Sequence, residues 1–240
     1  MYTSRPCRLE REIKFRDLDL RTHTEGDCVV PVLGWHLPAG ESLFPQDRRE
    51  HAEQALASDG GTSSTAAMTT SGALSSSRST AMIQNTHFPY ILVMKRGRES
   101  LHQAVQSRRF AGIDIAFVRR IAWRLASCLY GLHERGIIHG DVKPRNVLLY
   151  DDDKLVLCDL DTSAKKGTQR KEGEKMPSSG YSAPELERWR IWSALPESQR
   201  QTGLALEVTR ALDIWSFGVV LFELCSGERL FHRKSFACFL

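Results

Sequence analysis

The stretch HGDVKPRN, residues 139–146, carries the strongest chemical signal in this sequence. It brings together an aspartate, a lysine and an asparagine: Asp141, Lys143 and Asn146. Transfer of a phosphoryl group requires a carboxylate that orients the nucleophile, cations that hold the charge, and metal ligands. Each residue type alone is common in turns, but this combination predicts phosphoryl-transfer chemistry.

A helix and a hairpin flank this stretch. Residues 113–136 have apolar side chains at helical spacing and end at a glycine, which predicts a long helix. The apolar runs on either side of the acidic turn 151–153 predict two antiparallel strands. The second strand would return Asp159 to the side of Asp141 and Asn146. Asn146 and Asp159 offer the oxygen ligands that Mg²⁺ prefers.

Other segments have clear periodic patterns. Residues 58–82 consist mainly of Ser, Thr, Ala and Gly, and they predict a disordered insertion. The basic loop 162–179 is interpreted as a solvated loop. The apolar helix ending at residue 227 has almost no polar face, which predicts that it crosses the core. The expected helices are 8–20, 99–105 and 210–227, and the expected strands are 28–35 and 89–95.

Composition excludes several classes of protein. The net charge of +4 comes from 33 basic and 29 acidic residues spread along 240, too mild a balance to predict nucleic-acid binding. The six cysteines form no C-x-x-C pair, so we expect free thiols in a reducing, intracellular environment. The N-terminus is too charged for a signal peptide, and no apolar run could span a bilayer. We therefore expect a soluble, cytoplasmic or otherwise intracellular protein without membrane partners.

Three further motifs follow in order: CDLD at 158–161, GYSAPE at 180–185 and DIWSFG at 213–218. With HGDVKPRN, they make the chain resemble the eukaryotic protein kinase domain of the Ser/Thr type. The resemblance implies an α+β fold, with ATP and Mg²⁺ as cofactors and a Ser or Thr of a protein as the acceptor. It covers roughly residues 9–231 apart from insertions.

The resemblance also implies a role for each matching residue. Asp141 matches the catalytic aspartate, and Lys143 matches the lysine typical of Ser/Thr kinases. Asn146 and Asp159 match the metal ligands. Met94 with Lys95 falls at the hinge that receives adenine, and Leu148 would lie beneath the base. The remaining matches are structural or regulatory: Ser178 beside the catalytic loop, Glu185 of the APE motif, Asp213 as the anchor of that loop, and Glu12 as the helix-C glutamate, with Glu10 as its alternative.

The motif HGD followed by four residues and Asn is also typical of aminoglycoside and choline kinases. The APE and DIWSFG motifs, with Lys143 and Pro144, favour a protein kinase instead. Gly140 then stands where most relatives have the arginine that pairs with a phosphorylated activation loop. We therefore expect this loop to order without phosphorylation.

The pattern departs from the family at both ends. Only eleven residues precede Glu12, too few for three strands, a Gly-rich loop and the paired lysine, and no G-x-G-x-x-G occurs elsewhere. We expect a partial N-lobe over 1–98, with helix C and two strands, and a mostly helical, truncated C-lobe over 99–240. The DFG equivalent is Asp159-Leu160-Asp161, in which leucine can serve as the apolar plug. Core surface left exposed would attract a protein partner.

Two hypotheses for function remain. The first is a Ser/Thr protein kinase domain that is impaired in this chain, because the Gly-rich loop and the upstream lysine are missing. The second is a pseudokinase that acts as a scaffold or allosteric partner. The four residues Asp141, Lys143, Asn146 and Asp159 favour the first hypothesis, because a scaffold has no physical need for them.

Overall fold

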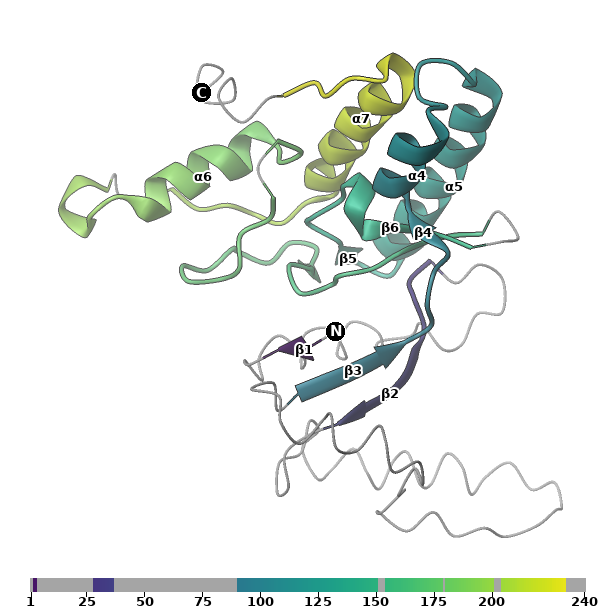
Figure 1. The fold of residues 1–240 in the computed structure, drawn as a ribbon. Coiled ribbons are helices and arrows are strands. Elements are labelled where there is room, and N and C mark those ends of the chain that lie inside the picture. The colour runs from purple at the N-terminus through teal and green to yellow at the C-terminus, as the bar shows by residue number, and fades with distance from the viewer. Residues whose placement is uncertain are drawn as a thin grey trace, which may run out of the picture.

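The computed structural model describes residues 2–3, 28–36, 90–150, 154–178, 180–200 and 204–231. The helix expected over 8–20, with Glu12, and the low-complexity segment 58–82 lie outside these residues. What is described is a small antiparallel sheet beside a larger, mostly helical part (Figure 1). The predicted α+β class is confirmed.

The small sheet has the strand order β1-β3-β2, from Tyr2–Thr3, Tyr90–Met94 and Val32–His36. The strand expected over 89–95 is confirmed as β3. The strand expected over 28–35 begins later, at Val32, because the residues before it pair elsewhere: Val29 forms a parallel bridge with Leu157 of the larger part. This segment therefore links the two parts of the fold.

The helices α4 and α5 follow the sheet. α4 spans Leu101–Arg108 and begins with a capping box between Ser100 and Gln103. It starts two residues later than expected because β4 (Glu99–Ser100) pairs with β6. α5 spans Ile115–Glu134, as the periodicity predicts, and the side chain of Asp114 caps it.

The predicted hairpin is confirmed as β6 (Val147–Leu149) and β7 (Leu155–Leu157), paired antiparallel. A second pair, β5 (Ile137–Ile138) and β8 (Ala164–Lys165), was not predicted. The 3₁₀ turn η1, Pro144–Asn146, leads from the catalytic loop into β6. Together these elements bring the ends of HGDVKPRN and CDLD to one place.

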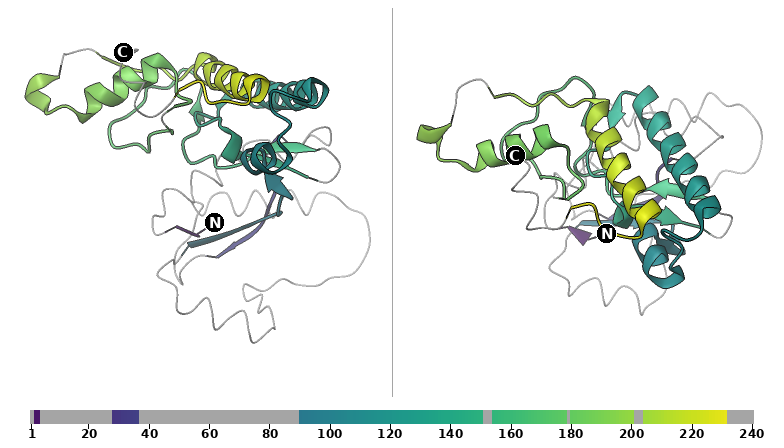
Figure 2. Two further views of the ribbon diagram at one scale, coloured as in Figure 1. Left: turned by 45° about the horizontal axis from the view of Figure 1, so that its top comes forward. Right: turned by 90° about the horizontal axis from the view of Figure 1, so that it is seen from above.

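Two further helices complete the described fold. α6 spans Pro184–Ala194 and begins with proline at its first turn, and a 3₁₀ turn, η2, Glu197–Gln199, follows it. α7 spans Arg210–Ser226, as predicted, and runs beside α5 (Figure 2). The expectation that this helix crosses the core holds for one side of it, where Val220 and Leu224 are buried; large apolar side chains on another side are exposed in the described structure: Ile214, Trp215 and Phe222.

Two apolar clusters hold these elements together. The larger one joins α4, α5, the hairpin and α7, with Leu125, Leu132 and Leu157 among its fully buried side chains. The smaller one joins β5, α6 and the start of α7 around Trp189 and Leu212. Apolar residues of the motifs belong to both clusters: Val142 and Leu160 to the larger one, and Ala183 to the smaller one.

Candidate active site

A buried carboxylate, Asp213 of α7, holds the backbone of the loop that carries Asp141. Its oxygens accept hydrogen bonds from the backbone nitrogens of His139 at 2.9 Å and Gly140 at 2.8 Å, and the ring Nε2 of His133 lies 2.8 Å away. Asp213 is fully buried, so these donors replace the water it has lost. The anchoring geometry expected for Asp213 is therefore present.

The ring of His139 makes a second connection that sequence reasoning missed. Its Nδ1 accepts from the backbone nitrogen of Asp141 at 3.2 Å, so its Nε2 donates to the carbonyl of Cys158, also at 3.2 Å. The imidazole thus joins the loop at Asp141 to the residue before Asp159. The only signal in the sequence was the histidine at the start of the motif.

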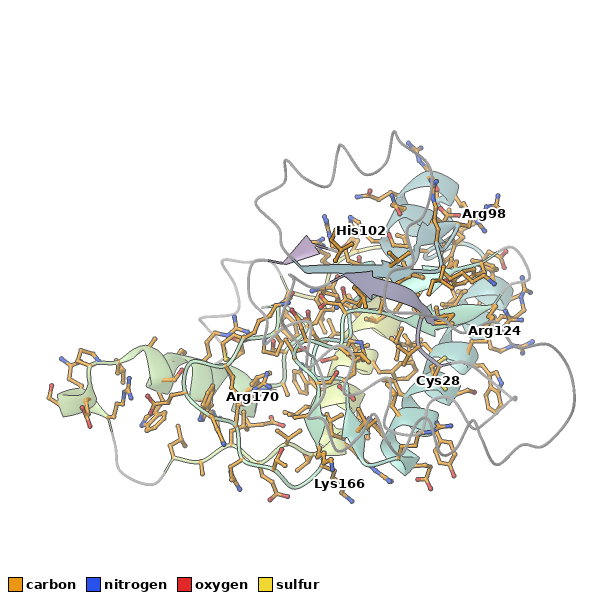
Figure 3. The ribbon with its side chains drawn as sticks, turned by 90° about the horizontal axis from the view of Figure 1, so that it is seen from below. Cys28, Arg98, His102, Arg124, Lys166 and Arg170 are labelled. Atoms are coloured by element: carbon orange, nitrogen blue, oxygen red, sulfur yellow. The ribbon has the colours of Figure 1, made fainter. Side chains whose placement is uncertain are left out.

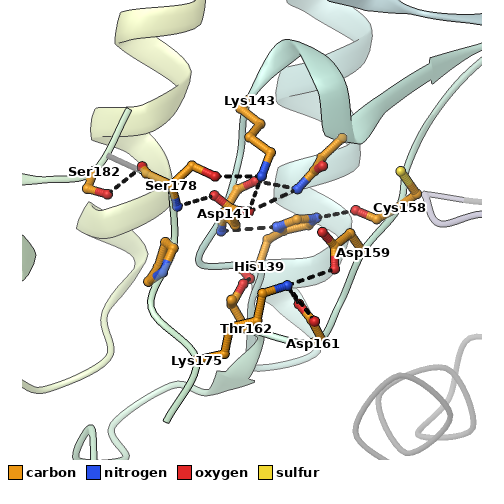
Figure 4. A network of polar contacts seen from close by, with 12 residues as sticks. His139, Asp141, Lys143, Cys158, Asp159, Asp161, Thr162, Lys175, Ser178 and Ser182 are labelled. Atoms are coloured by element: carbon orange, nitrogen blue, oxygen red, sulfur yellow. Dashed lines mark hydrogen bonds and ion pairs between the residues drawn. The ribbon is translucent and has the colours of Figure 1, made fainter. Parts of the chain in front are cut away.

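Three predicted site residues converge around the carboxylate of Asp141 (Figure 4). Lys143 Nζ lies 2.5 Å from Asp141 Oδ2 and donates to Ser178 Oγ at 2.7 Å. The backbone nitrogen of Ser178 donates to Asp141 Oδ1 at 2.9 Å. Asn146 Nδ2 donates to the carbonyl of Asp141 at 2.9 Å and lies 3.2 Å from Oδ2. The carboxylate is therefore held in one orientation while Lys143 neutralises it.

Asp159 has an unusual backbone conformation. Its φ of +68° lies in the left-handed region, which costs a non-glycine residue about 1–2 kcal/mol. Leu160, the residue expected to act as an apolar plug, is fully buried in the larger cluster. Asp161 has no positive φ, so an aspartate in place of glycine adds no left-handed strain at that position.

Lys175 brings a cation to this pair of aspartates. Its Nζ lies 2.5 and 2.6 Å from the two carboxylate oxygens of Asp161, whose side chain is fully buried, and 3.7 Å from Asp159 Oδ1 (Figure 4). Lys175 belongs to the basic loop that was interpreted as solvated. For this residue that interpretation is wrong, because the buried Asp161 requires a counter-charge.

Arg170 departs from the solvated interpretation as well. It is buried, and its guanidinium donates to the carbonyls of Thr162 at 3.1 Å and Lys175 at 3.3 Å, with Glu174 Oε2 at 3.5 Å. Lys166 of the same loop is exposed at the outer edge of the molecule, as expected (Figure 3). A linear sequence cannot separate these two kinds of basic residue, because their partners depend on how the loop folds back.

The oxygen donors near Asp141 suit a magnesium ion that is shared with a nucleotide. Asn146 uses its amide nitrogen for the bonds to Asp141, and its amide oxygen is the atom type that Mg²⁺ prefers. Asp159 supplies a carboxylate. No cluster of three or more His, Cys, Asp or Glu side chains that could hold a metal occurs within the described ranges. Magnesium is commonly held by one or two protein ligands plus substrate phosphates, so the pair fits this requirement.

The residues expected beneath adenine lie where the two parts of the fold join. Met94 ends β3, and the backbone nitrogen of Lys95 donates to the carbonyl of Pro31 at 3.2 Å. The hydroxyl of Tyr150 donates to the carbonyl of Lys95 at 3.0 Å. Leu148 lies on β6, the strand that β4 pairs with. The segment 94–95 is therefore fixed to the end of the strand that carries Leu148.

The other predicted positions are less informative. Glu185 is exposed in the first turn of α6, whereas the neighbouring Glu187 is buried and pairs with Arg190 at 3.2 Å. Glu12 lies outside the described residues. Among the residues that the structure describes, no helix is long and apolar enough to cross a membrane.

A cavity of about 530 Å³ adjoins the site on the side of Lys143 and Ser178. Tyr181 lies at its wall and donates its hydroxyl to Glu223 Oε2 of α7 at 2.6 Å. Burial raises the pKa of Tyr181, and this hydrogen bond raises it further, so the phenol stays protonated. Sequence reasoning missed this cavity, since its walls come from segments far apart along the chain.

A buried aspartate that anchors a loop, with a lysine, an asparagine and a serine gathered around the carboxylate of Asp141, is an arrangement that fits phosphotransferases. The model of the protein kinase domain matches residues 78–237. The chain therefore belongs to the protein kinase domain family, and the predicted family and kinase-like fold are confirmed.

Similar proteins carry names of the same kind. The chain is 34% identical over 122 residues to the human serine/threonine-protein kinase Kist. This alignment covers 50% of the present chain and 27% of Kist. It is 30% identical over 132 residues to a putative dual specificity tyrosine-phosphorylation-regulated kinase 3 homolog of Drosophila melanogaster. This alignment covers 55% of the present chain and 14% of that protein. It is 27% identical over 147 residues to the serine/threonine-protein kinase AFC2 of Arabidopsis thaliana. This alignment covers 58% of the present chain and 34% of AFC2. The matched part thus spans about a third or less of these relatives.

Proposed function

We propose that this chain is a Ser/Thr protein kinase domain that transfers the γ-phosphoryl group of ATP to a hydroxyl group of a protein. The convergence of Lys143, Asn146 and Ser178 on the carboxylate of Asp141 carries the proposal. The names of its relatives support an acceptor on a protein. As the sequence predicts, the protein would work inside the cell, without nucleic acid or membrane as a partner.

Each residue has a defined task in this proposal. Asp141 orients the acceptor hydroxyl and takes its proton as the new oxygen–phosphorus bond forms and ADP leaves. Lys143, 2.5 Å from that carboxylate, neutralises charge on the transferred group. Asn146 and Asp159 would hold Mg²⁺, which would supply positive charge for the phosphate oxygens. Ser178 fixes the orientation of Asp141 through its backbone nitrogen.

Adenine would bind between Met94, Lys95 and Leu148. No G-x-G-x-x-G occurs among the 240 residues, so this polypeptide brings no such loop to cover the phosphates. Losing one preorganised electrostatic group costs a rate factor on the order of 100 to 1,000. We therefore propose weak, magnesium-dependent ATP binding and impaired transfer for the isolated polypeptide. The alternative is a pseudokinase that acts as a binding scaffold or allosteric partner.

Calorimetric titration with ATP, with and without Mg²⁺, tests the proposal on the purified chain. We expect binding that requires Mg²⁺ and is lost in Asp159→Ala, while the exposed control Glu185→Gln binds like the unmodified chain. Radiolabel transfer to a generic Ser/Thr substrate is the second measurement, with Asp141→Asn as its control. Absence of nucleotide binding would favour the scaffold. Micromolar binding with rapid transfer abolished by Asp141→Asn would support the kinase and overturn the proposed impairment.

A further inference from the structure

The cavity beside Asp141 is positioned to contact the part of a substrate that flanks the acceptor hydroxyl. Lys143 and Ser178, which both contact Asp141, belong to its wall. With about 530 Å³ it can receive a large side chain. Its walls also include residues of α6 and α7, so it extends from the catalytic loop across the surface of the helical part.

Two arginines of this wall are available for binding. Arg145 lies in the 3₁₀ turn after the catalytic loop, and Arg229 follows α7; both are exposed. Neither forms an ion pair with a carboxylate within the described part of the chain. Arg145 Nη2 lies 3.3 Å from His102 Nε2 of α4.

His102 and Tyr181 show that the two arginines act on the same region. Burial lowers the pKa of His102, and the charges of Arg145 and Arg229 lower it further, although Glu223 opposes them. The same two arginines also act to lower the pKa of Tyr181, against the larger effects of burial and of Glu223. Both arginines line the cavity itself, and they come from segments far apart in the chain.

The remaining charged groups of the wall already have partners. Lys143 pairs with Asp141, and Arg190 pairs with Glu187. Glu223, the one carboxylate among the described wall residues, is buried and accepts the Tyr181 hydroxyl. Because the Tyr181 phenol is neutral, Glu223 keeps its negative charge, and the two positive charges of Arg145 and Arg229 exceed it.

We propose that this cavity is a specificity subsite for an anionic group, a carboxylate or a phosphate, close to the acceptor residue of the protein substrate. This inference rests on the proposed function, which puts the acceptor hydroxyl at Asp141. Guanidinium groups bind carboxylates and phosphates through paired hydrogen bonds, so two converging arginines favour such a group over a neutral side chain. The substrate class would be proteins whose acceptor is flanked by acidic or phosphorylated residues.

Peptide binding measured without nucleotide tests the subsite independently of transfer. Fluorescence anisotropy would compare peptides that share one acceptor serine and carry Gln, Glu or phosphoserine at each of three positions on either side. We expect the Glu peptide to bind about threefold and the phosphoserine peptide about tenfold more tightly than the Gln peptide, at one or more positions. The preference should weaken as salt rises.

Charge variants then test the residues. The double variant Arg145→Gln/Arg229→Gln should abolish the preference, and Arg145→Glu/Arg229→Glu should reverse it toward a peptide with Lys. Arg119→Gln, an exposed arginine of α5 away from this cavity, is the matched control and should keep the preference. Circular dichroism confirms that each variant is folded.

The outcomes separate this inference from the proposed function. Equal binding of all three peptides, no detectable binding of any, or a preference that survives the double variant would overturn the subsite, even if ATP transfer occurs. A preference for Glu and phosphoserine that depends on the two arginines would support it, even if the chain fails to bind ATP. A response to phosphoserine alone would identify the anion as a phosphate.

Discussion

The catalytic loop and the activation segment, residues 159–178, are both held by charged side chains, but of opposite sign. In the catalytic loop the anchor is an anion, Asp213, which accepts from backbone N–H groups. In the activation segment the corresponding charges are two cations of the segment itself. Arg170 donates to the carbonyl of Thr162, and Lys175 pairs with Asp161. This activation segment therefore supplies its own counter-charges, a role that a phosphate and an arginine fill together in many kinases.

The two regions meet at Gly140. This glycine has a φ of +78°, and a Cβ built on it would lie 2.9 Å from the carbonyl oxygen of Thr162 in the activation segment. Arg170 donates to that same carbonyl at 3.1 Å. A larger residue at position 140 would therefore push the activation segment away from the catalytic loop. The absence of the usual arginine at Gly140 fits this close contact.

The largest effect is expected from removing the anion. Asp213→Ala leaves His133 and two backbone N–H groups in the core without their acceptor, so we expect a loss of about 3–5 kcal/mol in the free energy of unfolding. Urea denaturation measures it, with Glu185→Gln as the exposed control. A loss below about 1 kcal/mol would show that the loop is held by other contacts.

Alanine substitutions at two glycines measure how much the close contact between the two regions contributes to stability. Gly140 and Gly167 both have positive φ, +78° and +82°, but a Cβ at Gly167 meets nothing within 4 Å. Gly167→Ala should therefore cost only the backbone strain, about 1–2 kcal/mol. Gly140→Ala should cost more, by about 1 kcal/mol or more, because Thr162 must move. Equal losses in urea denaturation would mean that the close approach to Thr162 has no energetic weight.

Replacing a cation of the activation segment should have a smaller effect on stability and a second effect on metal binding. Lys175→Met removes the ammonium group that pairs with the buried Asp161, at a cost of about 1–2 kcal/mol, since the side chain of Lys175 is 32% exposed and water partly screens the pair. It also removes a cation 3.7 Å from Asp159, so Mg²⁺ should bind with ATP about threefold or more tightly.

Lys166→Met, at an exposed lysine of the same segment, is the control for both measurements. Urea denaturation reports the stability, and calorimetric titration with ATP and Mg²⁺ reports the affinity. Weaker binding in Lys175→Met than in the control would show that Lys175 supports the metal site instead of competing with the ion.

Local patterns in the sequence predicted the parts of this fold that depend on neighbouring residues. The periodicity of residues 115–134 and the two apolar runs around the turn 151–153 were sufficient for α5 and the β6–β7 hairpin. α6 was missed because its buried residues, such as Trp189, alternate irregularly with charged ones. The buried side of α7 could not be separated from its exposed side, since both carry large apolar residues.

The candidate site shows the same division. The motif letters alone pointed to Asp141, Lys143 and Asn146, which the structure brings together. The partners of Arg170 and Lys175 depend on the path of the loop, so charge alone suggested a solvated segment. The arginine-lined cavity was missed for a related reason. Arg145 and Arg229 are far apart in the sequence, and only the tertiary fold places both of them in the wall of one cavity.

The smallest effect is expected where a phosphate would usually act. Thr162 is buried, with its hydroxyl 3.3 Å from the carbonyl of His139, and is closed to a modifying enzyme, whereas Thr168 is exposed and donates to the carbonyl of Lys165 at 2.7 Å. Because the segment is already held by its own cations, Thr168→Ala and Thr168→Asp should each change the free energy of unfolding by less than about 0.5 kcal/mol.

Trypsin should cut the segment at the same rate in both variants as in the unmodified chain. Arg170→Gln is the positive control, since losing the buried guanidinium should speed cleavage. Faster cleavage in Thr168→Ala, reversed in Thr168→Asp, would show that a negative charge at Thr168 orders the segment, and the self-anchoring role of the cations would then be wrong.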